Sequence, residues 1–198
     1  VINIKMIIIY IEMLSREHLD VIDICTPPHA HAPVAIEAME SGCNVLMEKP
    51  MALSVSDCDQ MIHAAEKYDV KLSVVHNQRF YPPFIRSQEL VNNGTIGKLT
   101  GMRILQATNS SEYMASENHW VHRLPGGVVG ETGPHAVYMS LAFLKNVKDA
   151  DIYARKTLDY AWVLYDEYRI ELAGQDASSA ITISHANEFT ADEVELFG

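Results

Sequence analysis

Three short apolar runs, separated by helix-length segments, constrain the fold of the first half of this chain. The runs Val21–Thr26, Asn44–Met47 and Lys71–Val75 are typical of β-strands bounded by turn residues. The segment between the first two has its apolar residues on one helical face, and Ser54 or Ser56 can cap a helix between the last two. An order of strand, helix, strand, helix, strand predicts parallel strands joined by right-handed crossovers.

A lysine directly follows the second predicted strand, in the sequence Glu48-Lys49-Pro50. The carboxyl ends of the strands are where an open α/β sheet places its chemistry. A lysine held there between a carboxylate and a proline can be desolvated, and it can then exchange a proton with a substrate hydroxyl. The alternative is an ordinary surface Glu–Lys pair in a loop.

The pattern changes in the second half of the chain, where strands are joined by short turns. A helix from Pro82 to about Asn92 precedes a strand at Leu99–Gln106, and another helix begins near His135. Four further strands are predicted, at Asp151–Arg155, Tyr165–Leu172, Ala180–His185 and Glu193–Phe197. Short connections favour antiparallel pairing. We therefore expect two partial domains, over residues 1–96 and 97–198.

Composition and charge exclude several classes of protein. The net charge of −11 disfavours nucleic acid and anionic membrane surfaces as partners. The three cysteines form no C-x-x-C pair, and their odd number argues against a disulfide framework, which predicts a reduced, cytoplasmic protein. The spacing of the histidines predicts no metal site. The apolar stretch Ile2–Leu14 is too short to span a bilayer and predicts a buried strand or helix at the start of a truncated domain.

Four motifs together resemble the glucose-fructose oxidoreductase / inositol dehydrogenase / rhizopine catabolism (Gfo/Idh/MocA) family, from about residue 10 to residue 198. They are Thr26-Pro27-Pro28, Glu48-Lys49-Pro50, Asn77-Gln78-Arg79 and the glycine-rich stretch that ends in Glu131-x-x-x-His135. The resemblance implies a Rossmann-type doubly wound parallel sheet with its first strands missing, followed by an α+β domain with a largely antiparallel open sheet. It also implies NAD or NADP as cofactor. The chain has no G-x-G-x-x-G, which the family carries in an earlier strand–helix unit.

The resemblance assigns roles residue by residue. Lys49 matches the catalytic, nicotinamide-adjacent lysine, and His135 matches the histidine that acts as acid and base on the substrate hydroxyl. Glu131 stands where the family usually has Asp; it can orient His135 from one helical turn away, or it can be a first-turn acid favoured by the helix dipole. The implied cofactor-binding positions are Thr26, Pro27, Pro28, His31, Glu48, Lys49, Pro50, Asn77 and Arg79, and the implied substrate positions are Trp120 and His122.

Several of these assignments have structural alternatives. His31 can equally cap the next helix, and Asn77 and Arg79 can belong to a solvated loop. Trp120 can be a core aromatic residue instead of the border of a substrate pocket.

Two functions follow from this pattern. The first is an NAD(P)-dependent oxidoreductase that moves a hydride between nicotinamide and a sugar, a cyclic polyol or a related hydroxy compound. The second is a non-catalytic NAD(P)-binding sensor or regulator on the same fold, and a cofactor-using glycosidase is a third possibility. The presence of both Lys49 and His135 favours the enzyme, in which their side-chain tips would lie within about 10 Å of each other. A homo-oligomer, dimer or tetramer, is expected because open sheets often pair across subunits.

Overall fold

The structure is a computed structural model that describes residues 10–110 and 114–198. The chain divides into two compact units, Val1–Val75 and His76–Gly198, and each is considered separately. The domain ranges predicted above, 1–96 and 97–198, differ from this division in assigning residues 76–96 to the first part. Those ranges stay a prediction about the domains of the whole protein.

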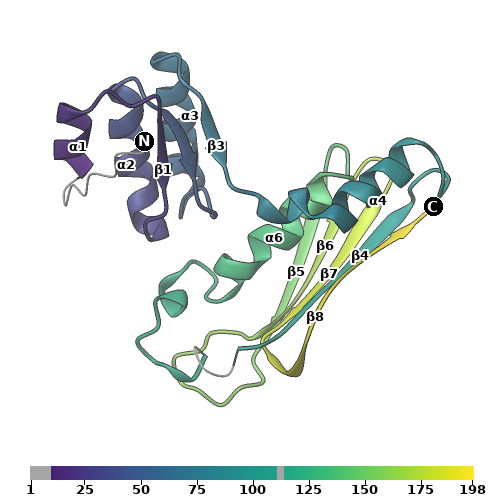
Figure 1. Cartoon of the computed structure of the whole chain (residues 1–198). Helices are drawn as coiled ribbons and strands as arrows, with labels where there is room; N and C mark the ends of the chain where they lie inside the picture. The colour runs from purple at the N-terminus through teal and green to yellow at the C-terminus, as the bar shows by residue number, and fades with distance from the viewer. Residues whose placement is uncertain (1–9, 111–113) are drawn as a thin grey trace. The chain divides into compact units, whose positions relative to one another are not determined.

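The first unit contains the predicted parallel sheet (Figure 1). Its strands lie in the order β1-β2-β3, and Ile22 of β1 lies opposite Val45 of β2. The strands lie side by side in the same order as in the sequence, and both crossovers are right-handed. The two connecting helices therefore cover the same face of the sheet. The elements are α1 (Tyr10–Arg16), β1 (Val21–Ile24), α2 (His31–Glu40), β2 (Asn44–Met47), α3 (Val55–Lys67) and β3 (Leu72–Val74).

The core of this unit lies between the sheet and α2 and α3. Alternate strand residues such as Ile24 and Met47 are buried against Met39 of α2 and Met61 of α3. Of the two candidate caps for α3, the structure selects Ser54, whose Oγ accepts a hydrogen bond from the backbone N–H of Asp57 at 3.1 Å.

The predicted buried segment at the start of the chain is only partly described. Residues 2–9 lie outside the described residues. Tyr10, Met13 and Leu14 of α1 are half-buried and pack against the core of the first unit. The expectation of a helix is therefore met over Tyr10–Leu14, although this helix has no fully buried residue.

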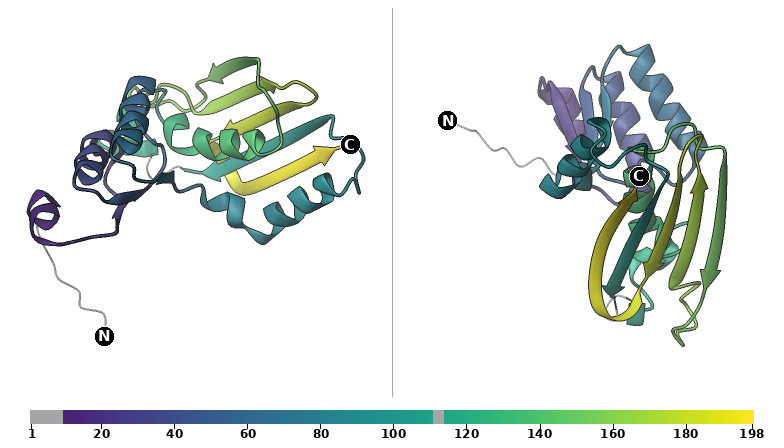
Figure 2. Two further views of the ribbon diagram at one scale, coloured as in Figure 1. Left: turned by 90° about the horizontal axis from the view of Figure 1, so that it is seen from above. Right: turned by 90° about the vertical axis from the view of Figure 1, so that its right-hand side faces the viewer.

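The second unit is a five-stranded sheet in the order β5-β6-β7-β4-β8 (Figures 1 and 2). All neighbouring strands are antiparallel except β4 and β7, which are parallel, so the predicted fold class is confirmed. The strand β8 begins much earlier than expected because it pairs along almost the whole length of β4, with an irregularity between Ala107 and Asn109. The strands are β4 (Gly101–Asn109), β5 (Asp149–Arg155), β6 (Glu167–Ala173), β7 (Ser178–Ser184) and β8 (Ala186–Phe197).

Two helices, α4 (Pro82–Asn92) and α6 (Val129–Leu141), cover one face of this sheet. Strand β6 shows the resulting alternation, since Tyr168 and Ile170 are buried beneath the helices while Arg169 is exposed on the other face. The two helices also meet each other at the end of α6, where Phe84 of α4 packs edge-on against Phe143 at 5.3 Å between ring centroids. Among the described residues, no helix combines the length and apolarity needed to cross a membrane.

The start of α6 corrects a prediction. The helix was expected to begin near His135, but it begins at Val129 and includes Gly130, Gly133 and Pro134. The glycines serve close packing instead: a Cβ on Gly130 would lie 2.9 Å from the carbonyl oxygen of Pro125. His135 therefore lies in the second turn of the helix, with Glu131 one turn before it.

Candidate active site

In the first unit, the loops after β1 and β2 lie at the same edge of the sheet, as predicted. Thr26 follows β1 and Lys49 follows β2, and these strands are adjacent and parallel. His31, the first residue of α2, is fully buried and connects the two loops. Its Nδ1 lies 2.8 Å from the carbonyl oxygen of Pro50, and its Nε2 lies 2.9 Å from that of Thr26.

Two roles were considered for His31, contact with the cofactor and capping of the next helix. Its side chain makes no cap hydrogen bond to α2, since the N-cap residue of that helix is Ala30. It fixes the spacing of the two loops that were predicted to line the cofactor crevice. Its contact with a cofactor stays a prediction.

The turn at Glu48-Lys49-Pro50 is held by local hydrogen bonds. The Glu48 backbone N–H donates to the carbonyl oxygen of Ile24 at 3.0 Å, which extends the ladder between β1 and β2 by one residue. The Lys49 N–H donates to Glu48 Oε2 at 3.2 Å, and the Lys49–Pro50 peptide bond is cis. All three residues are half-buried, whereas Thr26 and Pro27 on the neighbouring loop are exposed. The carboxyl edge of the sheet thus presents an ordered backbone and one lysine.

In the second unit, His135 belongs to a cluster of polar and aromatic side chains. Its Nδ1 lies 2.6 Å from the hydroxyl of Tyr138, one turn further along α6. The Tyr138 hydroxyl also donates to Asn77 Oδ1 at 3.3 Å and accepts from the backbone N–H of Gln78 at 3.2 Å. The ring of His76 stacks on that of Tyr138, with 4.3 Å between centroids.

The sequence motifs predict His135 and Asn77 of this cluster but not Tyr138 or His76. The available signal was the spacing His135-x-x-Tyr138, which places two polar groups on one face of a helix. Burial, together with the nearby guanidinium of Arg79, lowers the pKa of His76 below its ordinary value. His76 is therefore held as the neutral imidazole near pH 7, which suits its stacking on a tyrosine ring.

The two predicted substrate residues lie in the 3₁₀ helix Trp120–Arg123, ahead of the glycine-rich stretch. Trp120 is 44% exposed, so it is not a core aromatic residue. His122 is half-buried, and its Nε2 is a buried atom with no hydrogen-bond partner among the described residues. The position of both residues beside a substrate stays a prediction.

Buried polar contacts hold α6 in place. Gly126 and Gly127, both with positive φ, lead into the helix, and the Tyr168 hydroxyl donates to the Gly126 carbonyl at 3.0 Å. Burial raises the pKa of Tyr168 to about 12. Thr132, one residue after Glu131, contacts Nε2 of the buried His185 at 3.1 Å. These contacts fix the helix that carries Glu131 and His135.

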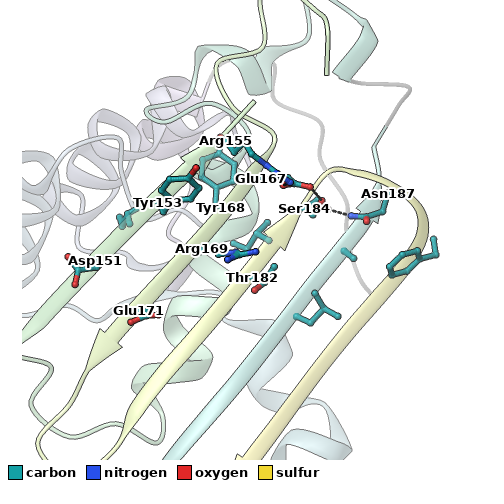
Figure 3. A pocket seen from close by; sticks show the side chains of 15 residues that line it. Asp151, Tyr153, Arg155, Glu167, Tyr168, Arg169, Glu171, Thr182, Ser184 and Asn187 are labelled. Carbon is teal, nitrogen blue, oxygen red and sulfur yellow. Dashed lines mark hydrogen bonds and ion pairs between the residues drawn. The ribbon is translucent and has the colours of Figure 1, made fainter. Parts of the chain in front are cut away.

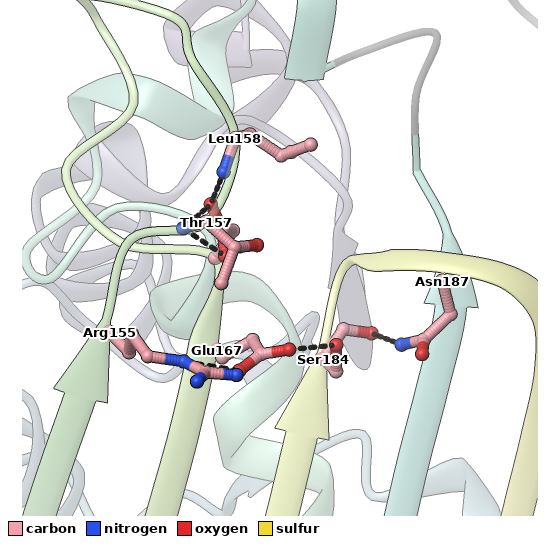
Figure 4. A network of polar contacts seen from close by, with 7 residues as sticks. Arg155, Thr157, Leu158, Glu167, Ser184 and Asn187 are labelled. Carbon is pink, nitrogen blue, oxygen red and sulfur yellow. Dashed lines mark hydrogen bonds and ion pairs between the residues drawn. The ribbon is translucent and has the colours of Figure 1, made fainter.

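A separate hollow of about 690 Å³ lies on the sheet face away from α4 and α6 (Figure 3). It holds none of the predicted site residues. Arg155 forms an ion pair with Glu167, and Glu167 accepts a hydrogen bond from Ser184 at 3.4 Å (Figure 4). Within the described residues, no three His, Cys, Asp or Glu side chains are grouped as metal ligands would be, and the prediction of a metal-free site stays a prediction.

Comparison with known proteins agrees with this arrangement. The model of the Gfo/Idh/MocA family, described as an oxidoreductase family with an NAD-binding Rossmann fold, matches residues 4–76. An oxidoreductase of Formosa agariphila is 26% identical over 143 residues, which cover 69% of this chain and 44% of the relative. A glycosyl hydrolase family 109 protein of Shewanella baltica is 37% identical over 90 residues, which cover 46% of this chain and 20% of the relative. The chain thus spans less than half the length of these curated relatives.

A solved structure shows the same fold over both units. The WlbA dehydrogenase from Chromobacterium violaceum, crystallised with NADH and UDP-GlcNAcA, covers 95% of this chain with a TM-score of 0.83 and 20% identity, and this chain covers 56% of that protein. The predicted cofactor, NAD or NADP, is confirmed at the level of the family, whose fold is NAD-binding. Residues 4–76 of the chain are thus similar to the Gfo/Idh/MocA oxidoreductase family.

Proposed function

We propose that the whole protein is an NAD(P)-dependent oxidoreductase that acts on a CH–OH group of a sugar, a cyclic polyol or a related hydroxy compound. The observation that carries this proposal is the His135–Tyr138–Asn77 cluster, because it presents an ordered imidazole on a buried hydrogen-bonding partner. Such an imidazole is suited to remove a proton from a hydroxyl near neutral pH. Lys49, at the carboxyl end of β2, supplies the second group.

The first unit fits a nicotinamide cofactor at the carboxyl edge of its sheet. Exposed Thr26 and Pro27 and the half-buried Glu48-Lys49-Pro50 turn lie where an open α/β sheet receives a dinucleotide. A bound nicotinamide would supply the hydride acceptor at its C4 atom. In this proposal, Thr26, Pro27, Pro28, Glu48, Lys49, Pro50, Asn77 and Arg79 line the cofactor, and His31 holds the first two loops at their spacing.

The chain's own residues perform the proton transfer. We propose that His135 takes the proton from the substrate hydroxyl while a hydride leaves the carbon that bears this hydroxyl for the nicotinamide. The CH–OH group thereby becomes a carbonyl. Glu131 stabilises the imidazolium that results, and the Lys49 ammonium stabilises negative charge that develops on the substrate oxygen. Trp120 and His122 border the substrate. Lys49 and His135 would then approach one substrate within about 10 Å of each other.

The test is nicotinamide absorbance with the full-length protein over a panel of sugars and polyols. Lys49→Met and His135→Ala should each lower turnover by roughly two to four orders of magnitude, and Glu131→Gln by less. Lys71→Met is the matched control, because Lys71 is exposed and precedes β3, at the opposite edge of the same sheet. If Lys49→Met turns over as fast as Lys71→Met, Lys49 has no catalytic role.

Two other outcomes would replace the proposal. Tight cofactor binding without turnover on any substrate, with ligand binding that only changes association with a partner, would identify a regulator. Hydrolysis of a nitrophenyl glycoside without net change in nicotinamide absorbance would identify a cofactor-using glycosidase.

We also propose that the protein is a homo-oligomer that pairs through the uncovered face of the second unit's sheet, and that it resides in the reduced cytoplasm. The uncovered face exposes Tyr153 and Phe189 at 64% and 59%, beside alternating charges such as Arg169 and Glu171. Cys25, Cys43 and Cys58 are all free thiols. Light scattering should give a multiple of the chain mass for the wild type and a monomer for Tyr153→Glu. A monomeric wild type would exclude the pairing.

A further inference from the structure

The buried Tyr138 hydroxyl contacts polar groups of Asn77, Gln78 and His135. The residue is 6% exposed, and its oxygen lies within hydrogen-bonding distance of Gln78 N, Asn77 Oδ1 and His135 Nδ1. The contact with His135 Nδ1 is the shortest of the three, at 2.6 Å. These contacts all lie within the second unit.

The proton inventory of this cluster determines which imidazole nitrogen carries a hydrogen. A phenol has one proton to donate and two lone pairs to accept with. The backbone N–H of Gln78 can only donate, so it occupies one lone pair. The side-chain oxygen of Asn77 can only accept, so it receives the hydrogen bond that the phenolic O–H donates. Because the phenol has no second proton, the contact with His135 must be a hydrogen bond that Nδ1–H donates to the Tyr138 oxygen.

We infer that Tyr138 is a positioning residue that fixes His135 as the Nδ1–H tautomer, which leaves Nε2 as the nitrogen that receives the substrate proton. This inference rests on the proposed function for its catalytic meaning, but the tautomer itself is a property of the protein alone. Because a phenol is neutral, it orients the imidazole without stabilising positive charge as a carboxylate would. Orientation and charge stabilisation are thus divided between Tyr138 and Glu131.

The direct test is ¹⁵N–¹H NMR of the full-length protein labelled at histidine, without cofactor or substrate, at a pH where His135 is neutral. We expect a protonated Nδ1 and an unprotonated Nε2 for His135. Tyr138→Phe keeps the ring that stacks on His76 but removes the hydroxyl, and it should shift the population toward Nε2–H. Tyr168→Phe is the matched control, since it removes another buried hydroxyl of the unit, one that bonds to the Gly126 and Tyr165 carbonyls. It should leave the tautomer of His135 unchanged.

Asn77 provides a second test that avoids the buried position. Its side chain is exposed, so a substitution should not prevent folding. Asn77→Ala removes the acceptor of the phenolic proton, which is then available to His135 Nδ1, and the tautomer should shift toward Nε2–H. Asn77→Asp retains a side-chain oxygen and should preserve Nδ1–H. A wild-type protein with protonated Nε2, or an Asn77→Ala variant identical to wild type, would overturn the inference.

Activity separates this inference from the proposed function. On a substrate that the wild type oxidises, Tyr138→Phe should lower kcat by about tenfold with little change in KM, since one hydrogen bond to the base is lost. If the protein oxidises no substrate but shows the Nδ1–H tautomer, the proposed function fails and the tautomer assignment stands. If it is active and His135 carries its proton on Nε2, only the role of Tyr138 is wrong.

Discussion

The buried His185 should make the second unit less stable in acid. Its side chain is 2% exposed and contacts the Ser110 and Thr132 hydroxyls at 3.0 and 3.1 Å. Burial lowers the pKa of His185 to about 4, an effect that the Asp166 carboxylate only partly offsets. Because the folded pKa lies below the unfolded value of 6.5, the unfolded state binds more protons between these values. The contribution of neutral His185 to the free energy of unfolding is therefore fully present above about pH 6.5, and it is lost as the pH falls toward 4.

The magnitude follows from the two pKa values. At pH 5 the unfolded histidine is almost fully protonated and the folded one is not, which lowers the free energy of unfolding by about 2 kcal/mol relative to pH 7. Further acidification to pH 4 should bring the loss to about 3 kcal/mol. The lowered pKa of His76 acts in the same direction, so the observed loss should be at least this large.

The assay is urea unfolding at pH 7 and pH 5, followed by tryptophan fluorescence. Both tryptophans, Trp120 and Trp162, lie in the second unit, so the signal reports the unit that contains His185. His185→Gln removes the titrating group and should reduce the loss between the two pH values by about 2 kcal/mol. His63→Gln, an exposed histidine of the first unit, is the control and should leave the loss unchanged. An equal pH dependence in the wild type and His185→Gln would refute the reasoning.

Three substitutions test other parts of the fold by urea unfolding. Ser54→Ala removes the N-cap of α3 and should cost about 1 kcal/mol, detected by circular dichroism because the first unit has no tryptophan, whereas Ser56→Ala should cost less. Met39→Ala, at a position with no exposed surface, should cost about 2–5 kcal/mol, and an effect below 1 kcal/mol would mean that the core collapses around the cavity. Asp166→Asn should cost about 1–3 kcal/mol, because the fully buried carboxylate accepts at Oδ2 from the backbone N–H groups of Thr157 and Leu158 and at Oδ1 from the Thr157 hydroxyl, whereas an amide has only one accepting oxygen. An unchanged fluorescence midpoint would contradict this.

The sequence predicted the elements whose signals are local. Strand β2 was predicted with its observed bounds, and β1 and β3 to within two residues, because short apolar runs between turn residues have few alternatives. The early start of β8 was missed because its first half is largely polar, and its conformation depends on pairing with β4, which lies far earlier in the chain, as in the pair Asn109 and Ala186. The parallel pairing of β4 with β7 was missed for the same reason. Such pairings depend on tertiary contacts that a local pattern does not contain.

The candidate site shows the same limit. Lys49 and His135 could be found from motifs, and the structure places both on ordered backbone. The contacts of His31 with two carbonyl groups could not be predicted, because they join residues from separate loops. Tyr138 was missed because it lies among apolar residues of α6, where a tyrosine is usually a core residue. Its hydroxyl has a polar role because it lies beside Asn77, the Gln78 N–H and His135.

The central place of β4 in its sheet has a consequence for folding. This strand is the first of the five to be synthesised, yet both of its neighbours, β7 and β8, come from the last part of the chain. The hairpins β5–β6 and β6–β7 pair strands that follow each other in the chain and can form early, whereas the pairing of β4 must await the closure of a much longer loop. Until then Met102 and Ile104, both buried in the finished sheet, are exposed to other chains. Pulse-labelled hydrogen exchange during refolding should therefore show protection of β6 before β4, and aggregation should be greatest in the interval between them.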